Sequence, residues 1–265
     1  MNGVRLSVLP VAADAATVVE LAESADRAGI DGVWFGVLGR DPAVAKVDDA
    51  YVMVALAGAA SRSRDVRLGA LLNLAPDRAP LTSAEDIGVL DQASGGRLEL
   101  GLIPSTEPGW VKRAALVLGA WSDWPVAGHD VVVTPRPAQP RVPRVVLSGA
   151  DDGSVRGGLQ AGALLVDTHR RHAEVIAGER RVLVSTRAVP DGSDIDELGD
   201  YVSALRDDVE AAAADEVVAS ISPAAARDHR FLTLLAGVVA PVLRCPRTDV
   251  PVLLFDAVNW WRKRQ

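Results

Sequence analysis

The sequence predicts a single α/β domain over residues 1–265, arranged as a (β/α)8 TIM barrel with a proline-rich excursion between the fourth and fifth strands. Hydrophobic residues make up 49% of the chain and aromatic residues only 4%, which predicts an aliphatic core of helices packed on strands. Short apolar runs alternate with longer alanine-rich stretches from end to end. Eight such units in roughly 250 residues fit a barrel. An open doubly wound sheet is the competing architecture, because periodicity does not reveal closure.

The first four strand–helix units occupy residues 4–121. Strands are predicted over residues 4–8, 32–35, 66–72 and 97–102. Helices are predicted over residues 13–28, 48–61, 82–93 and 110–121. The first helix carries an apolar stripe at helical spacing, formed by Val18, Leu21, Ala22 and Ala25. Gly29 ends this helix, and Thr82 with Glu85 three residues later predicts a capping box at the start of the third.

Residues 124–143 interrupt this alternation with five of the 16 prolines. Such a composition predicts an extended excursion over the surface that belongs to the same domain. The later strands are predicted over residues 144–147, 163–166, 181–188 and 216–220. The later helices are predicted near residue 154 and over residues 195–214 and 223–239.

Composition and charge exclude several classes of protein. No run approaches the roughly 18 apolar residues of a membrane span, and the N-terminal stretch predicts a strand in place of a secretory signal. We therefore expect a soluble, cytoplasmic protein that does not bind membranes. A net charge of −7, with acidic residues spread along the chain, predicts no nucleic-acid partner. The single Cys245 excludes an internal disulfide, and no metal-binding motif is present.

Candidate site residues follow the predicted strands, because (β/α)8 barrels place their chemistry at the carboxyl ends of the strands. The candidates for cofactor binding are Gly36, Leu72, Asn73, Ser105, Ser148, Gly149 and Ala150. Ser148 and Gly149 are the best candidates for holding a phosphate, because small residues near a helix start expose backbone N–H groups. A plain turn is the alternative there. The catalytic candidates are His169, which titrates near neutral pH, and Glu107.

Two segments carry a resemblance to a known family: Leu21 to Trp34, and Ser61 through Gly69 to Gly101, which includes a Ser-Gly-Gly-Arg turn. They resemble the bacterial luciferase-like monooxygenases, whose members use FMN or the deazaflavin coenzyme F420. A weaker similarity continues through residues 121–149. The resemblance implies a TIM barrel and a flavin- or deazaflavin-dependent oxidoreductase acting on a small organic substrate. The turn at residues 94–97 is expected to be structural, as a helix stop before a strand.

The sequence departs from the family after two strands. Val37 and Leu38 stand where deazaflavin-using members often place an acidic residue and a histidine, and neither side chain transfers protons. Ile103 and Pro104 stand where members often carry a glycine-rich turn, and Glu107 matches the glutamate of that turn only with a one-residue slip. A second hypothesis is therefore a diverged, non-catalytic member, either a cofactor binder or a partner subunit without a cofactor.

The resemblance also implies an oligomer. Family members commonly pair through the helices that flank the second and third strands. The alanine-rich stretch over residues 53–60 would support such close helix packing. We expect a homodimer or a heterodimer with a related subunit.

Overall fold

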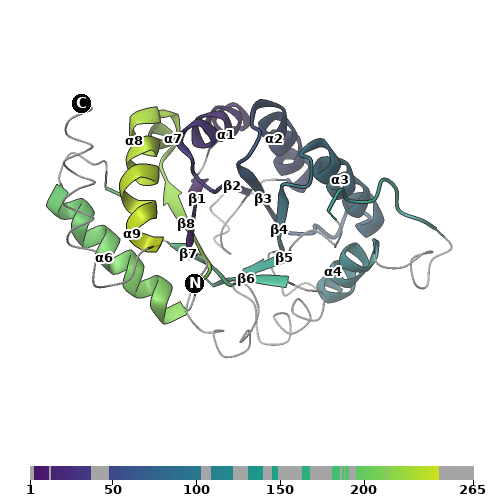
Figure 1. Ribbon diagram of the computed structural model, residues 1–265. Coiled ribbons are helices and arrows are strands. Elements are labelled where there is room, and N and C mark those ends of the chain that lie inside the picture. Colours follow the sequence, from purple (N-terminus) through teal and green to yellow (C-terminus); the bar gives the residue numbers. More distant parts are fainter. Residues whose placement is uncertain are drawn as a thin grey trace.

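The computed structural model has a sheet of parallel strands that curls around on itself (Figure 1). It describes residues 3–11, 13–36, 48–102, 109–121, 131–139, 145–148, 163–167, 181–185, 187, 189–190, 195–212 and 214–244. The strands are β1 (Arg5–Pro10), β2 (Gly32–Gly36), β3 (Arg67–Leu72), β4 (Leu98–Leu102), β5 (Val145–Ser148), β6 (Ala163–Asp167), β7 (Arg181–Ser185) and β8 (Glu216–Ile221). Neighbours in the chain pair in parallel, and β8 pairs with β1, with Ser7 opposite Val218.

Helices cover the outside of this sheet (Figure 1). They are α1 (Ala15–Ala28), α2 (Asp49–Arg62), α3 (Pro80–Ala93), α4 (Trp110–Gly119), α6 (Ile195–Ala212), α7 (Pro223–Arg227), α8 (His229–Leu234), the π-helical turn η1 (Leu235–Val239) and α9 (Ala240–Arg244). The predicted α/β class and parallel sheet are confirmed. A helix after each of the eight strands is not shown, because residues 149–162 and 168–180 lie outside the described part of the chain.

Two helix predictions are wrong in detail. The helix predicted over residues 223–239 is interrupted at Asp228, whose carboxylate accepts hydrogen bonds from the backbone N–H groups of Arg230 (2.9 Å) and Phe231 (3.3 Å) and so starts α8. The predicted capping box at Thr82 is absent, because α3 begins two residues earlier at Pro80. Proline is favoured at the first helical position, where its missing N–H costs nothing. Ala79 precedes it and provides no side-chain cap.

The excursion lies against α3 where the structure describes it, over residues 131–139. The Gln139 side-chain amide donates to the Asp91 carboxylate at 2.7 Å, and the Gln92 amide donates to the Arg136 carbonyl oxygen at 2.6 Å. Gly88 allows the close approach, since a Cβ there would stand 2.4 Å from the Pro135 carbonyl oxygen. Residues 131–139 are thus anchored to α3.

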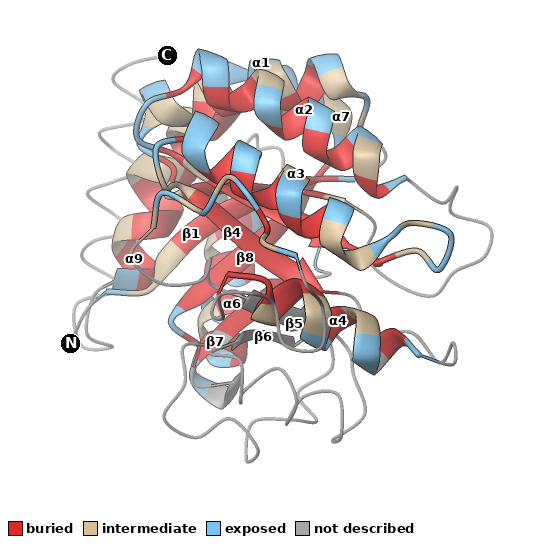
Figure 2. Cartoon of the chain, turned by 90° about the vertical axis from the view of Figure 1, so that its right-hand side faces the viewer, coloured by how far each residue is buried: buried red, intermediate tan, exposed pale blue. Residues whose placement is uncertain are grey.

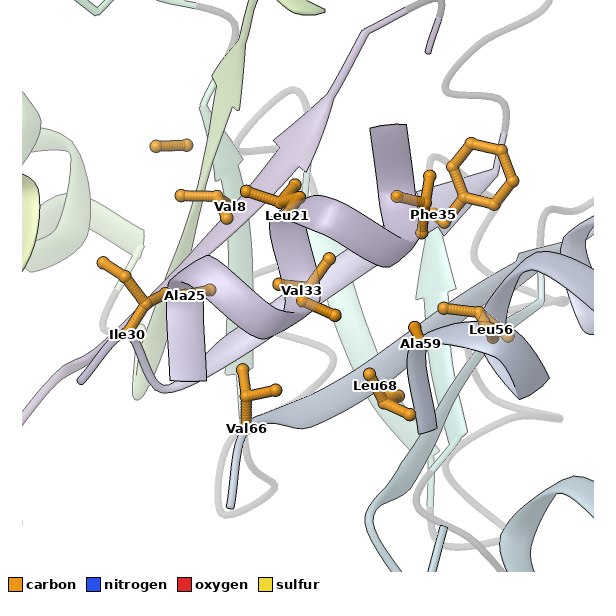
Figure 3. Close-up of a cluster of buried hydrophobic side chains, with 14 of the residues drawn as sticks. Val8, Leu21, Ala25, Ile30, Val33, Phe35, Leu56, Ala59, Val66 and Leu68 are labelled. Carbon is orange, nitrogen blue, oxygen red and sulfur yellow. The ribbon is translucent and has the colours of Figure 1, made fainter. Parts of the chain in front are cut away.

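Two apolar cores flank the sheet. The larger one fills the layer between sheet and helices, and Figure 3 shows side chains of α1, β2, α2 and β3 meeting there. Figure 2 shows the same pattern as buried inner faces and exposed outer faces on α1, α2 and α3. The smaller core lies inside the barrel and consists of Leu9, Trp34, Leu71, Val182, Val184 and Val218. The Trp34 ring covers Gly69, where a Cβ would lie 2.0 Å from the indole.

Candidate functional site

The amino-terminal end of the barrel is closed by a buried ionic network. Arg5 begins β1 and contacts the carboxylates of Glu99 (3.1 Å) and Glu216. Arg67 begins β3 and donates to Glu99 at 2.6 Å. Both glutamates are buried, with side-chain exposures of 1%. In barrels this end contributes stability and the opposite end contributes chemistry, so we assign the network a structural role.

Glu216 is the most strongly perturbed carboxyl of this network. It accepts hydrogen bonds from the Ser7 hydroxyl at 2.6 Å and from the Trp34 indole N–H at 3.1 Å. Burial and, to a smaller extent, the neighbouring Glu99 raise its pKa, and Arg5, Ser7 and Trp34 oppose the increase, so that the pKa is about 7. The network therefore holds a carboxyl that titrates near neutral pH.

An open depression of about 400 Å³ lies at this same end of the barrel. Its lining combines Arg5 and Arg67 with Asp26, Asp31 and Asp65. The two arginines already contact Glu99, as described above. This depression lies at the amino ends of the strands, whereas the barrel architecture predicts the active site at their carboxyl ends.

At the carboxyl end of the barrel, Asn73 offers a polar side chain. Leu71 belongs to the inner core and Leu72 to the outer core. Successive residues of a strand point to opposite faces, so Asn73, which directly follows β3, continues the inner row. It is half-buried. Within the described part of the chain, its side-chain amide makes no hydrogen bond. Asn73 therefore retains donors and an acceptor for a ligand.

A second polar side chain reaches the same end from β8. Ser220 follows Glu216 and Val218 on the inner row of that strand. Its hydroxyl donates to the Ser185 carbonyl oxygen of β7 at 2.8 Å, which fixes its position. Below both polar groups, the inner core closes the barrel with aliphatic side chains and the Trp34 ring. An apolar floor with a few polar groups at its rim is typical of a small-molecule site.

The structure places the predicted site residues in three groups: one with its side chain at the barrel mouth, two whose positions are explained by packing, and those whose side chains are not described. Asn73 lies at the barrel mouth as expected. Gly36 also ends its strand there, but its φ of +140° and the 2.4 Å distance that a Cβ would have from the Leu71 carbonyl oxygen show that packing against β3 already requires glycine. The Leu72 side chain is buried in the outer core, so only its backbone faces the mouth.

For the remaining predicted residues, the described part of the structure does not include the side chains. Ser148 ends β5, and the structure describes its backbone only. The others, Ser105, Glu107, Gly149, Ala150 and His169, lie outside the described residues, as do Val37, Leu38, Ile103 and Pro104. His229 is exposed on α8.

Sequence reasoning missed three residues that surround Asn73. Asp49 on α2 accepts hydrogen bonds from the backbone N–H groups of Asn73 and Leu74, both at 2.9 Å. On α4, the Trp110 indole donates to the Asn73 carbonyl oxygen at 3.1 Å, and Arg113 donates to the Leu74 carbonyl oxygen at 3.0 Å. All three lie in the first turns of helices, away from the strand ends at which barrel chemistry is expected. The only sequence signal for Asp49 is that it is a carboxylate at the start of the alanine-rich second helix.

The described residues fit a flat conjugated ring better than a metal ion. The faces of such a ring suit the aliphatic floor, and its nitrogen and oxygen edge suits Asn73. Among the residues that the structure describes, no group of three or more histidine, cysteine, aspartate or glutamate side chains is arranged to hold a metal. In the same part of the chain, no helix has the length and apolar character needed to cross a membrane.

The amino-terminal part of the chain matches the model of a known family. Residues 3–110 match the model of the luciferase-like monooxygenases. The predicted resemblance is confirmed. The luciferase-like segment covers β1 to β4 and ends at the start of α4, somewhat short of the residues 1–150 over which the sequence resembles the family. No curated protein matches the sequence.

Solved structures of luciferase-like enzymes share the fold over nearly the whole chain. Monooxygenase RslO1 from Streptomyces bottropensis is 18% identical, with a TM-score of 0.65 over 89% of this chain and 99% of its own. The FMN complex of the oxygenating constituent of 3,6-diketocamphane monooxygenase, from the CAM plasmid of Pseudomonas putida, is 15% identical, with a TM-score of 0.66 over 90% and 98%. The coenzyme F420-dependent tetrahydromethanopterin reductase of Methanopyrus kandleri is 14% identical, with a TM-score of 0.60 over 91% and 99%.

Proposed function

We propose that this protein is a luciferase-like oxidoreductase that binds FMN or coenzyme F420 at the carboxyl end of a complete (β/α)8 barrel and acts on a small organic substrate. The observation that carries the proposal is Asn73, a half-buried amide at the mouth of a barrel whose first four strands match the family. The FMN complex of the Pseudomonas putida enzyme and an F420–acetone adduct in a secondary alcohol dehydrogenase of this fold support the choice of cofactors.

Each part of the proposed site has a separate task. The inner core would carry the ring and exclude water from beneath it, and the Asn73 amide would orient the polar edge of the ring. Ser148, Gly149 and Ala150 would hold the phosphate through backbone N–H groups. Glu107 and His169 are the proposed groups for moving protons. When bound, the cofactor supplies the hydride or oxygen chemistry.

Binding of the two cofactors is the experiment that tests this function. The purified protein is titrated with FMN and with F420 while cofactor fluorescence is recorded. We expect saturable binding of one of them and about a tenfold weaker affinity in the variant N73A, because the loss of one hydrogen bond worth about 1.4 kcal/mol weakens binding by that factor. Binding that is unchanged by N73A would move the site away from the mouth described above.

The second candidate is a diverged cofactor binder or partner subunit without turnover. Val37 and Leu38 favour it, since they remove the proton-transfer groups that deazaflavin-using members often carry after the second strand. Substrate turnover that depends on a reduced cofactor excludes this candidate. Binding of the cofactor without such turnover, tested with several small organic substrates, supports it.

We also propose that the protein forms a dimer through α2 and α3. Tyr51, Val54 and Val89 are exposed on these helices, and Val54 is 70% exposed. Exposed apolar side chains on both helices support an interface there. Sedimentation should give twice the 27.8 kDa mass of one chain, and V54K should give the single-chain mass. A wild-type protein that sediments as one chain contradicts the homodimer and leaves a related subunit as the partner.

A further inference from the structure

Carboxylates from two helices hold the two ends of β3. At the amino end, Asp26 of α1 accepts hydrogen bonds from the backbone N–H groups of Arg64, Asp65 and Val66, at 2.7–2.9 Å. At the carboxyl end, Asp49 of α2 accepts from Asn73 and Leu74 at 2.9 Å. The chemistry is the same, but only the second end belongs to the barrel mouth.

The two carboxylates differ in burial. Asp26 is half-exposed, and its hydrogen bonds lower its pKa despite partial burial. Asp49 is buried with an exposure of 5%, and burial raises its pKa although the backbone N–H groups of residues 73–75 oppose the increase. A buried carboxylate is costly unless its oxygens are hydrogen-bonded. Conversely, N–H groups deprived of such a partner are costly too, so carboxylate and loop hold each other in place.

The carbonyl groups of the same loop are held from the other side. The Trp110 indole, itself buried, donates to Asn73, and the Arg113 guanidinium donates to Leu74. Leu74 has a φ of +51°, which a residue with a side chain adopts only when its surroundings fix it. Both the N–H and the C=O of Leu74 and of Asn73 are thus occupied by side chains of α2 and α4. Four side-chain hydrogen bonds thus hold the backbone of these two residues, and with it the direction of the Asn73 Cα–Cβ bond.

We propose that Asp49 is a positioning residue, which together with Trp110 and Arg113 locks residues 73–75 so that the Asn73 amide is presented to the cofactor. The identity of the ligand rests on the proposed function, whereas the locking of residues 73–75 by Asp49 does not depend on it. Asp49 lies behind the loop and acts on the ligand only through Asn73. The arrangement supplies preorganisation, because the loop does not have to be ordered when the ligand binds.

The lock is tested without any cofactor by backbone amide exchange. D49N keeps the size of the side chain but replaces one accepting oxygen with an NH2 group. This donor would face the N–H donor of Asn73 or Leu74, so that one hydrogen bond is lost. We expect exchange at Leu74 to accelerate at least tenfold in D49N, while exchange in β6–β8 stays within twofold of wild type. D26N is the matched control, with acceleration confined to residues 64–66. Unchanged exchange at Leu74 in D49N overturns the proposal.

The link to the ligand is tested by a double-mutant cycle with FMN and F420 as probes. D49N should weaken the affinity for whichever cofactor binds about tenfold, D26N should leave it within twofold, and D49N should have no further effect when combined with N73A. Additive losses from D49N and N73A overturn the proposal, since Asp49 would then act otherwise than through Asn73. If neither probe binds the wild-type protein, the proposed function fails, and the exchange experiment still decides whether the lock exists.

Discussion

Replacement of Glu216 by glutamine should change how the stability of the protein depends on pH. The folded protein raises the pKa of this carboxyl from 4.5 to about 7. Because the folded state binds the proton more tightly than the unfolded state, the associated stability is fully present below pH 4.5 and is lost as the pH rises through 7. At about 1.4 kcal/mol for each pH unit between the two values, the loss is about 3 kcal/mol.

The assay is urea unfolding followed by circular dichroism, from below pH 4.5 to above pH 7. Relative to wild type, the free energy of unfolding of E216Q should increase by about 3 kcal/mol from the lowest to the highest pH, because wild type loses this stability and glutamine does not titrate. E85Q, on the exposed face of α3, is the control and should show no such trend. A constant difference between E216Q and wild type would refute the reasoning. So would a wild type that gains stability relative to E216Q as the pH rises, because Arg5 would then hold Glu216 ionised.

Three further substitutions follow from the packing and the caps. G69A should lower the free energy of unfolding by about 1–3 kcal/mol in urea titrations, because the new Cβ would stand 2.0 Å from the Trp34 ring; a neutral effect would show that the ring moves freely. G36A should destabilise at least as much, because the new Cβ would clash with the Leu71 carbonyl oxygen and because alanine disfavours the φ of +140° at this position; protein of wild-type stability would contradict this. A79D should stabilise by about 1 kcal/mol in thermal unfolding, because α3 lacks a side-chain cap, and no gain would mean that the helix start is already satisfied.

The strands and the first helices could be predicted from the sequence because local signals decide them. The apolar stripe from Val18 to Ala25 is buried in α1, and Gly29 ends that helix in a left-handed conformation with φ of +82°. The break at Asp228 was missed because an aspartate within an apolar period resembles a solvent-facing helix position. Only its hydrogen bonds to the following turn show that it starts a new helix.

The candidate site was predicted in part, for a different reason. Strand ends are local features, so Asn73 could be placed at the barrel mouth from its position after an apolar run. Asp49 and Arg113 act on Asn73 and Leu74 from 24 and 39 residues away in the chain. Such contacts arise only when α2 and α4 pack beside β3, and no spacing in one sequence reveals them.

Titration of the purified wild-type protein and of N73A with FMN and with F420 tests the central claim most directly. The account predicts saturable binding of one cofactor by the wild type and an affinity about tenfold weaker in N73A, as expected for one lost hydrogen bond. Absence of saturable binding of either cofactor by the folded wild-type protein would contradict it.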